Sequence, residues 1–167
     1  MLLEGPMGSG SGVVIADGWI LTAAHVLPVF TADGNPVGEA IEHPFLDLAL
    51  IPCEAAVGTG LRMADVLPEL HDPLRSYGWW LAVQYQMVEG FQGAAPGESS
   101  APVIHGCSGG AVTNERGELV GIIATVSYAR TQMGDGYAIT HMAGYTPIDE
   151  DVRGWITLHI LPEPEAK

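Results

Sequence analysis

Basic residues are scarce in this chain. Its 167 residues include 6 lysines and arginines against 20 aspartates and glutamates, which gives a net charge of −14 at pH 7. Because contacts to nucleic-acid phosphates need lysine and arginine, we expect no nucleic-acid partner. Charged residues make up only 16% of the chain, so the acidic excess reflects this shortage of basic residues and does not predict an acidic tail.

Long apolar runs and a secretory signal are also lacking. No run approaches the roughly 18 apolar residues of a membrane-spanning helix, so we expect no membrane insertion. Residues 1–12 lack the basic start and the apolar stretch of a signal peptide. That observation leaves the compartment open, since a cytoplasmic protein, a viral protein and a trimmed secreted protein would all agree with it.

Cysteine is rare and histidine is dispersed. Cys53 and Cys107 are the only cysteines, and two cysteines at this spacing predict neither a disulfide framework nor a metal site. The 6 histidines do not show the spacing of metal ligands. We therefore expect no metal and no cofactor, and we expect both thiols to be buried structural groups.

Glycine and proline are abundant, with 22 and 12 residues, and they separate short apolar runs. Asp17-Gly18 lies between two such runs and predicts a β-hairpin, and residues 33–36 predict another turn. Further runs of strand composition cover residues 46–52, 79–91 and 119–127. Several short strands separated by turns predict an all-β barrel or sandwich. The glycine-rich residues 8–12 lack the lysine of a phosphate-binding loop and are interpreted as a flexible segment.

Two segments are predicted to be helical. Apolar residues between Val152 and His159 recur with helical spacing and follow Asp149, so a helix is predicted over residues 149–159. Residues 23–27 predict a single helical turn. Prolines within residues 67–73 interrupt the strand pattern, and we expect the internal boundary of the chain there.

Three short motifs contain the residues that can carry chemistry. They are Thr22-Ala23-Ala24-His25, Asp47-Leu48-Ala49-Leu50 and Gly106-Cys107-Ser108-Gly109-Gly110. A serine hydroxyl becomes an effective nucleophile when a neighbouring base accepts its proton, and histidine titrates near neutral pH. A carboxylate orients that histidine and stabilises its protonated form. Glycines beside the serine let backbone N–H groups face a developing oxyanion.

In this order the motifs resemble the trypsin/chymotrypsin-like serine protease superfamily, above all its Deg-type and short viral or bacterial members. The resemblance extends over nearly the whole chain. It implies an all-β fold of two six-stranded antiparallel β-barrels with a short C-terminal helix. Residues 1–70 would form the first barrel and residues 71–167 the second, with a cleft between them.

The resemblance also implies a serine endopeptidase that hydrolyses peptide or protein substrates. His25 would be the general base, Asp47 its orienting carboxylate and Ser108 the nucleophile. The N–H groups of Gly106 and Ser108 would form the oxyanion hole. The first barrel would thus supply the base and the carboxylate, and the second barrel the nucleophile.

A pocket for the residue before the scissile bond is implied as well. Its expected lining is Pro102 at the floor, Ala124, Thr125 and Val126 along one wall, Gly136 on the opposite side and His105 at the rim. Because Pro102 carries no charge, we expect a small or apolar residue in this pocket. Asp135 would favour a basic residue instead if its carboxylate pointed inward.

Cys107 departs from the family pattern. Most members have aspartate or asparagine at this position, and the aspartate pairs with a newly released N-terminus during activation. A thiol cannot form that ion pair, so we expect a site that forms without N-terminal insertion.

Other interpretations stay open. Asp33 or Asp65 could take the place of Asp47, although neither begins an apolar strand. Cys107 could be the nucleophile, as in viral cysteine proteases of this fold, although it stands one residue before that slot. The same fold could also be an inactive peptide-binding or assembly module, or another hydrolase such as an esterase.

Overall fold

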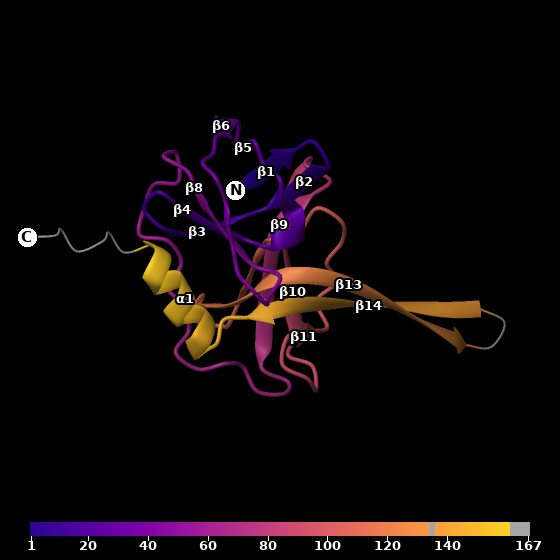
Figure 1. Cartoon of the computed structure of the whole chain (residues 1–167). Helices are drawn as coiled ribbons and strands as arrows, with labels where there is room; N and C mark the ends of the chain where they lie inside the picture. The colour runs from indigo at the N-terminus through magenta and orange to yellow at the C-terminus, as the bar shows by residue number, and fades with distance from the viewer. Residues whose placement is uncertain (134–135, 161–167) are drawn as a thin grey trace, which may run out of the picture.

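The computed structural model describes residues 1–133 and 136–160, which form mostly β-strands and one α-helix near the C-terminal end (Figure 1). The strands are β1 (Leu2–Gly5), β2 (Gly8–Ser11), β3 (Val13–Ala16), β4 (Trp19–Thr22), β5 (Thr31–Ala32), β6 (Asn35–Pro36), β7 (Ile41–Glu42), β8 (Ala49–Pro52), β9 (Pro73–Trp80), β10 (Gln84–Phe91), β11 (Glu98–Ser99), β12 (Ala111–Thr113), β13 (Leu119–Met133) and β14 (Gly136–Pro147). The helices are a 3₁₀ turn (Ala24–Val26) and α1 (Glu150–Ile160). No helix in these residues is long and apolar enough to cross a membrane.

Two four-stranded sheets make up the first half of the molecule. Their strand orders are β2-β1-β5-β6 and β3-β4-β8-β7. The hairpin of β3 and β4 turns at Asp17-Gly18, as predicted. The hairpin of β5 and β6 turns at Asp33 and Gly34, whose φ angles of 48° and 78° lie in the left-handed region that tight hairpin turns use.

The glycine-rich residues 8–12 are not a flexible segment, so that interpretation was wrong. Residues 8–11 form β2, which pairs with β1 along its whole length. A β-carbon on Gly10 would lie 2.5 Å from Val26 Cγ1, and one on Gly12 would lie 2.5 Å from Ile20 Cγ2. Gly10 and Gly12 are needed because neighbouring side chains approach the backbone closely at these two positions.

One six-stranded antiparallel sheet, with the order β10-β9-β12-β13-β14-β11, makes up the second half. The run of strand composition over residues 79–91 lies in a hairpin, in which β9 pairs with β10 from Trp80 and Gln84 to Pro73 and Phe91. Its turn contains Leu81 and Ala82 with φ angles of 46° and 58°. Since neither residue is typical of a left-handed turn, the sequence did not reveal the position of this turn.

The sheets have four, four and six strands, so the two closed six-stranded barrels that the resemblance implies are not confirmed. The second sheet curves into a half-barrel, and its outer strands approach one another through a single bridge between Gln92 and Ser99. Residues 62–64 lie against this sheet as well, because Leu119 N–H donates to Arg62 O and Ala64 N–H donates to Leu119 O.

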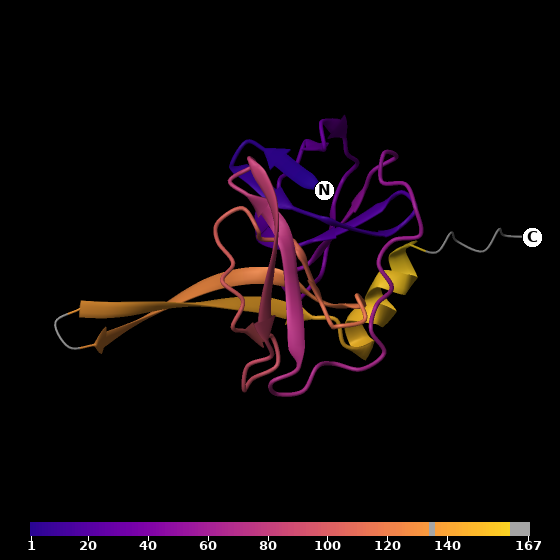
Figure 2. The ribbon, with the colours of Figure 1, turned by 180° about the vertical axis from the view of Figure 1, so that it is seen from behind.

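A long hairpin projects from the second half. The pairing of β13 with β14 runs from Gly121 and Pro147 to Met133 and Gly136. Figure 1 and, from behind, Figure 2 show this hairpin extending away from the body on the side opposite α1. The strand predicted for residues 119–127 is therefore confirmed but continues further than the sequence indicated.

The helix closes a core that both halves share. Val152 and Ile156 of α1 are fully buried in a cluster that includes Leu21 and Leu50 from the first half and Ile122 from the second. Asp149 caps the helix, because its Oδ1 accepts the Val152 N–H at 2.9 Å. The predicted helix and its cap are confirmed, and so is the single helical turn in residues 23–27.

Candidate active site

The pairing of β4 with β8 brings His25 and Asp47 together. Thr22, the last residue of β4, lies opposite Ala49, the first residue of β8. His25 follows Thr22 by three residues, and Asp47 precedes Ala49 by two, so both lie at the same end of this antiparallel pair. The buried run that begins at Leu48 anchors β8 in the core and fixes where the Asp47 carboxylate emerges.

The carboxylate of Asp47 binds His25 at two points. Asp47 Oδ2 lies 2.7 Å from His25 Nδ1, and Asp47 Oδ1 accepts the backbone N–H of His25 at 2.9 Å. A carboxylate is an acceptor, so the neutral imidazole carries its proton on Nδ1. Nε2 is then left as the proton acceptor, which is the tautomer that a general base needs.

The other two candidate aspartates are engaged elsewhere. Asp33 Oδ1 accepts the backbone N–H of Leu2 at 2.7 Å. Asp65 Oδ2 forms an ion pair with Arg62 at 2.9 Å on the surface. The structure therefore brings Asp47 to the histidine, and neither Asp33 nor Asp65.

His43 supports the loop that leads to Asp47, and the sequence analysis did not identify it. Its Nδ1 accepts the N–H groups of Phe45 at 3.3 Å and Leu46 at 3.1 Å. Its ring packs edge-on against Trp155 of α1, with ring centroids 4.9 Å apart. The His43 ring thus connects α1 to the loop that leads to Asp47.

The loop that contains Ser108 is built from close backbone contacts. Gly106 and Gly109 have φ angles of 93° and 82°, which favour glycine. A β-carbon on Gly106 would lie 2.5 Å from Trp79 O, and one on Gly109 would overlap the backbone of Ser11. The glycines of this motif are needed because the loop lies against both β9 and the first half.

His25, His105, Gly106 and Ser108 line one hollow of about 400 Å³. In the part of the chain that the structure describes, the N–H groups of Gly106 and Ser108 donate to no acceptor. Two unpaired donors beside a serine are the arrangement that binds an oxyanion. No hydrogen bond joins Ser108 Oγ to the His25 ring among the described residues, and such bonds often tighten only when substrate is bound.

The peptide between His105 and Gly106 has a defined orientation. His105 O accepts the N–H of Leu81 at 3.3 Å. Because C=O and N–H point in opposite directions across a trans peptide, the N–H of Gly106 points away from Leu81. The carbonyl of His105 is therefore held by Leu81, which lies in the turn between β9 and β10.

Cys107 faces the interior. Only 4% of the residue is exposed, and it packs in the core cluster of the second half with Val112 and Ile123. Burial raises the pKa of the Cys107 thiol, which disfavours the thiolate that nucleophilic attack requires. Both Cys107 and Cys53 are free and buried, so the geometry favours a structural role for Cys107.

The residues expected to form the substrate pocket are only partly brought together. His105 lines the same hollow as His25 and Ser108. Ala124 and Val126 are half-buried, whereas Pro102 and Thr125 are exposed.

Gly136, which was expected on the opposite side of that pocket, lies far along the hairpin from the predicted wall. Gly136 pairs with Met133 near the far end of the long hairpin, whereas Thr125 pairs with Gly144. Gly144, and not Gly136, is therefore the neighbour of the predicted wall in the sheet. Asp135 lies outside the described residues.

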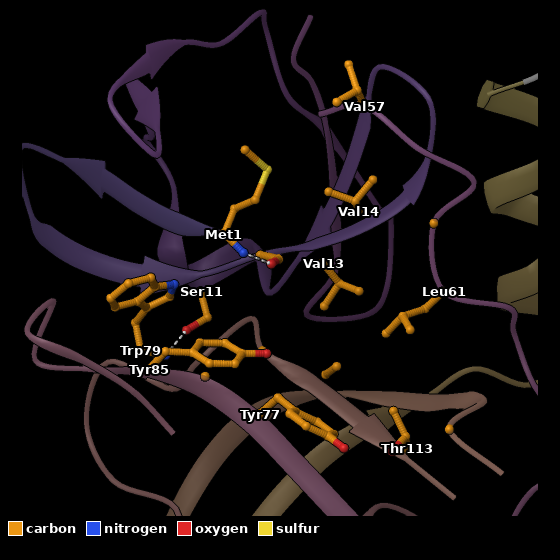
Figure 3. A pocket seen from close by; sticks show the side chains of 16 residues that line it. Met1, Ser11, Val13, Val14, Val57, Leu61, Tyr77, Trp79, Tyr85 and Thr113 are labelled. Carbon is orange, nitrogen blue, oxygen red and sulfur yellow. Dashed lines mark hydrogen bonds between the residues drawn. The ribbon is translucent and has the colours of Figure 1, made fainter. Parts of the chain in front are cut away.

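A second hollow, of about 540 Å³, lies between the two halves (Figure 3). Its lining includes Ser11, Val13, Tyr77, Trp79 and Tyr85. None of the three candidate catalytic residues lines it.

Comparisons with known proteins find similarity in structure and none in sequence. No protein-family model matches the chain, and no curated protein matches it. The Rv3671c protease of M. tuberculosis, in its inactive form, superposes with a TM-score of 0.69 at 16% identity, covering 96% of this chain and 88% of that one. Kallikrein-related peptidase 10 gives a TM-score of 0.68 at 21% identity, with 95% and 93% covered.

A third solved structure, the serine endoprotease from Yersinia pestis, gives a TM-score of 0.60 at 24% identity over 82% of this chain and 53% of that one. These neighbours have in common the architecture of trypsin-like serine proteases, and the similarity covers both halves of the chain. Together with the strand pairing described above, they identify the fold: this chain has the trypsin-like serine protease fold.

Proposed function

We propose that the protein is a serine endopeptidase that uses His25, Asp47 and Ser108. The observation that carries this proposal is the bidentate His25–Asp47 contact beside a hollow that also contains Ser108 and two unpaired N–H donors. We also propose that residues 1–70 and 71–167 act as two barrel-like halves, with the substrate bound between them. The strand pairing supports this division, because β1–β8 form the two four-stranded sheets and β9–β14 form the six-stranded sheet.

The chemistry proceeds in two stages. Ser108 Oγ attacks the carbonyl carbon of the scissile bond while His25 Nε2 takes the hydroxyl proton. The resulting oxyanion accepts hydrogen bonds from the N–H groups of Gly106 and Ser108. His25 returns the proton to the leaving amine, which leaves an acyl group on Ser108. Water, deprotonated by His25, then releases the acyl group and restores the serine.

The substrate is a peptide or protein, cleaved after a small or apolar residue. Support comes from the uncharged Pro102 and from the half-buried Ala124 and Val126 of the predicted pocket. Gly144, across from Thr125, takes the place of Gly136 in this proposal. A cleavage profile with a peptide library tests it, and a strong preference for lysine or arginine would contradict it.

An inactive peptide-binding module is the second candidate. It is favoured by one observation, which is that Ser108 Oγ and the His25 ring are not hydrogen-bonded in the described structure. The two candidates differ in whether Ser108 is chemically activated.

A fluorophosphonate probe separates the two candidates. The purified protein, Ser108→Ala and Cys107→Ala are treated with the probe, and the modified residue is identified by mass spectrometry. The proposal expects a label on Ser108 that persists in Cys107→Ala and disappears in Ser108→Ala. A folded protein that stays unlabelled would contradict the endopeptidase and favour the binding module.

A further inference from the structure

We infer that Ser11 is a positioning residue of the oxyanion hole, because its hydroxyl holds the peptide that follows Gly106. The inference rests on the proposed function, since it assigns the residue that orients one of the two proposed donors. Ser11 is the last residue of β2, and it lies 95 positions before Gly106 in the chain.

The Ser11 hydroxyl bridges three parts of the molecule. Ser11 Oγ donates to Gly106 O at 2.9 Å and accepts the backbone N–H of Trp79 at 2.8 Å. Figure 3 shows the Ser11 side chain pointing from β2 across to the backbone at Trp79. The first half, strand β9 and the nucleophile loop therefore meet at one hydroxyl.

The direction of these bonds is determined by the chemistry of the groups. A backbone N–H can only donate, so Trp79 occupies a lone pair of Ser11 Oγ. The single hydroxyl proton is then available for the carbonyl of Gly106. Ser11 is only 2% exposed, so both bonds lie in surroundings where a hydrogen bond is worth more than on the surface.

The backbone of Ser11 binds the same loop. Its N–H donates to Ser108 O at 2.7 Å. Its carbonyl accepts the hydroxyl of Thr22 at 2.8 Å. Ser11 is thus held in place by groups other than its own hydroxyl, and the hydroxyl is aimed at Gly106 by a rigid backbone.

Gly106 needs an external restraint. Because it has no β-carbon, its backbone can rotate more freely than that of other residue types, and its φ is 93°. Its N–H is one of the two proposed oxyanion donors. The peptide before Gly106 is held by the 3.3 Å bond from Leu81 to His105 O. The peptide after it is held at both ends: Ser11 Oγ donates to its carbonyl at 2.9 Å, and its N–H, that of Cys107, donates to Ile104 O at 3.1 Å. Among the described residues, Ser11 is the only one whose side chain hydrogen-bonds the backbone of residues 106–109.

The side chain of Cys107 does not hold the Gly106 carbonyl, and it offers no charged partner for the loop. Its buried thiol forms no ion pair, and burial raises its pKa and keeps it neutral. The hydroxyl of Ser11 therefore orders the loop from the first half, without a charged group inside the second. This arrangement explains how the donors can be preorganised in a chain that has cysteine before its nucleophile.

The test compares crystal structures and kinetics of the wild-type protein and Ser11→Ala. We expect the variant to lose the defined orientation of the Gly106 carbonyl and to turn the Gly106 N–H away from the hollow. We expect kcat for a peptide substrate to fall about 10- to 100-fold while KM stays within about threefold, because the interaction acts on the transition state. An unchanged loop, or equal kcat values, would overturn the inference.

Ser76→Ala is the matched control. Ser76 is 1% exposed, and its hydroxyl has no partner among the described residues. The same chemical change there removes a buried hydroxyl without touching the loop, so kcat and KM should not change. A similar loss of kcat in Ser76→Ala would mean that any buried hydroxyl has this effect, and it would overturn the positioning role.

Two further outcomes are decisive. If Ser11→Ala does not fold, Ser11→Cys keeps a side chain of similar size with a weaker donor, and we expect an intermediate loss of kcat with the same loop change. An intact loop in Ser11→Cys with wild-type kcat would overturn the inference. If the wild-type protein cleaves no peptide, the proposed function fails, and the two crystal structures still decide whether Ser11 orders the loop.

Discussion

The two halves of the molecule hold their catalytic groups in different ways. In the first half, the His25–Asp47 pair is joined by two hydrogen bonds at the end of a single strand pair, β4 and β8. In the second half, the Ser108 loop depends on partners from elsewhere, including Ser11. The base and its carboxylate are therefore assembled within one half, whereas the nucleophile and the oxyanion donors depend on the contact between the halves.

The largest expected effect comes from breaking the pair in the first half. In Asp47→Asn the amide can donate to Nδ1 and favour the wrong imidazole tautomer, so kcat should fall by about 10⁴-fold. Steady-state kinetics on a peptide substrate measure this change. The matched control is Asp65→Asn, because Asp65 is a surface carboxylate paired only with Arg62, and it should stay within about twofold. The reverse result would mean that the wrong carboxylate has been assigned.

The next largest effect should come from the contact between the halves. In Gly109→Ala the new β-carbon would overlap Ser11 O and Thr22 Oγ1, at a φ of 82°. We expect a loss of more than about 2 kcal/mol in the free energy of unfolding, because the strained backbone and the overlap add together. Chemical denaturation measures this loss, and activity should fall with it.

Gly117→Ala separates strain from overlap. Gly117 has a similar φ of 75°, but a β-carbon there would meet nothing within 4 Å. Its cost should be only about 1 to 2 kcal/mol, from the left-handed backbone alone. Equal costs for the two variants would mean that the loop does not pack tightly against the first half.

A smaller effect is expected at His43. Removing its ring in His43→Ala leaves the N–H groups of Phe45 and Leu46 without their acceptor and removes the contact with Trp155. We expect kcat to fall about 3- to 10-fold and the unfolding free energy to fall by about 1 kcal/mol. Phe45→Ala, in the same loop and 90% exposed, should change neither. Equal effects of both variants would contradict a specific role for the ring.

The smallest effect is expected at Cys107. Since burial raises the pKa of this thiol, little thiolate forms at neutral pH, and iodoacetamide should alkylate Cys107 slowly in the folded protein and rapidly after unfolding. Cys107→Ala should keep activity within about threefold. Rapid alkylation of the folded protein together with lost activity would mean that the thiol takes part in the reaction.

Local signals allowed much of the fold to be predicted. Asp17-Gly18 identified its hairpin, and Asp149 identified the start of α1. Such features depend on residues that are close together in the sequence. The position of the turn at Leu81 and Ala82 was not identified because neither residue is a typical turn former. The length of the β13–β14 hairpin was missed because nothing local marks where its strands leave the body.

The residues of the candidate site also differ in whether they could be predicted from local sequence. The motifs around His25, Asp47 and Ser108 could be read directly, and the resemblance to trypsin-like serine proteases implied their roles. The roles of Ser11 and His43 could not be read, because each depends on a contact that only the folded chain creates. Ser11 reaches Gly106 across 95 positions of sequence, and His43 reaches the helix through Trp155.

The most direct test of the account is a crystal structure of the protein after reaction with a fluorophosphonate. We predict a covalent bond between phosphorus and Ser108 Oγ, with the phosphonyl oxygen at about 2.7–3.1 Å from the nitrogens of Gly106 and Ser108. His25 Nε2 should lie within hydrogen-bond distance of Ser108 Oγ. An unmodified Ser108, or an adduct whose oxygen lies away from both nitrogens, would contradict the account.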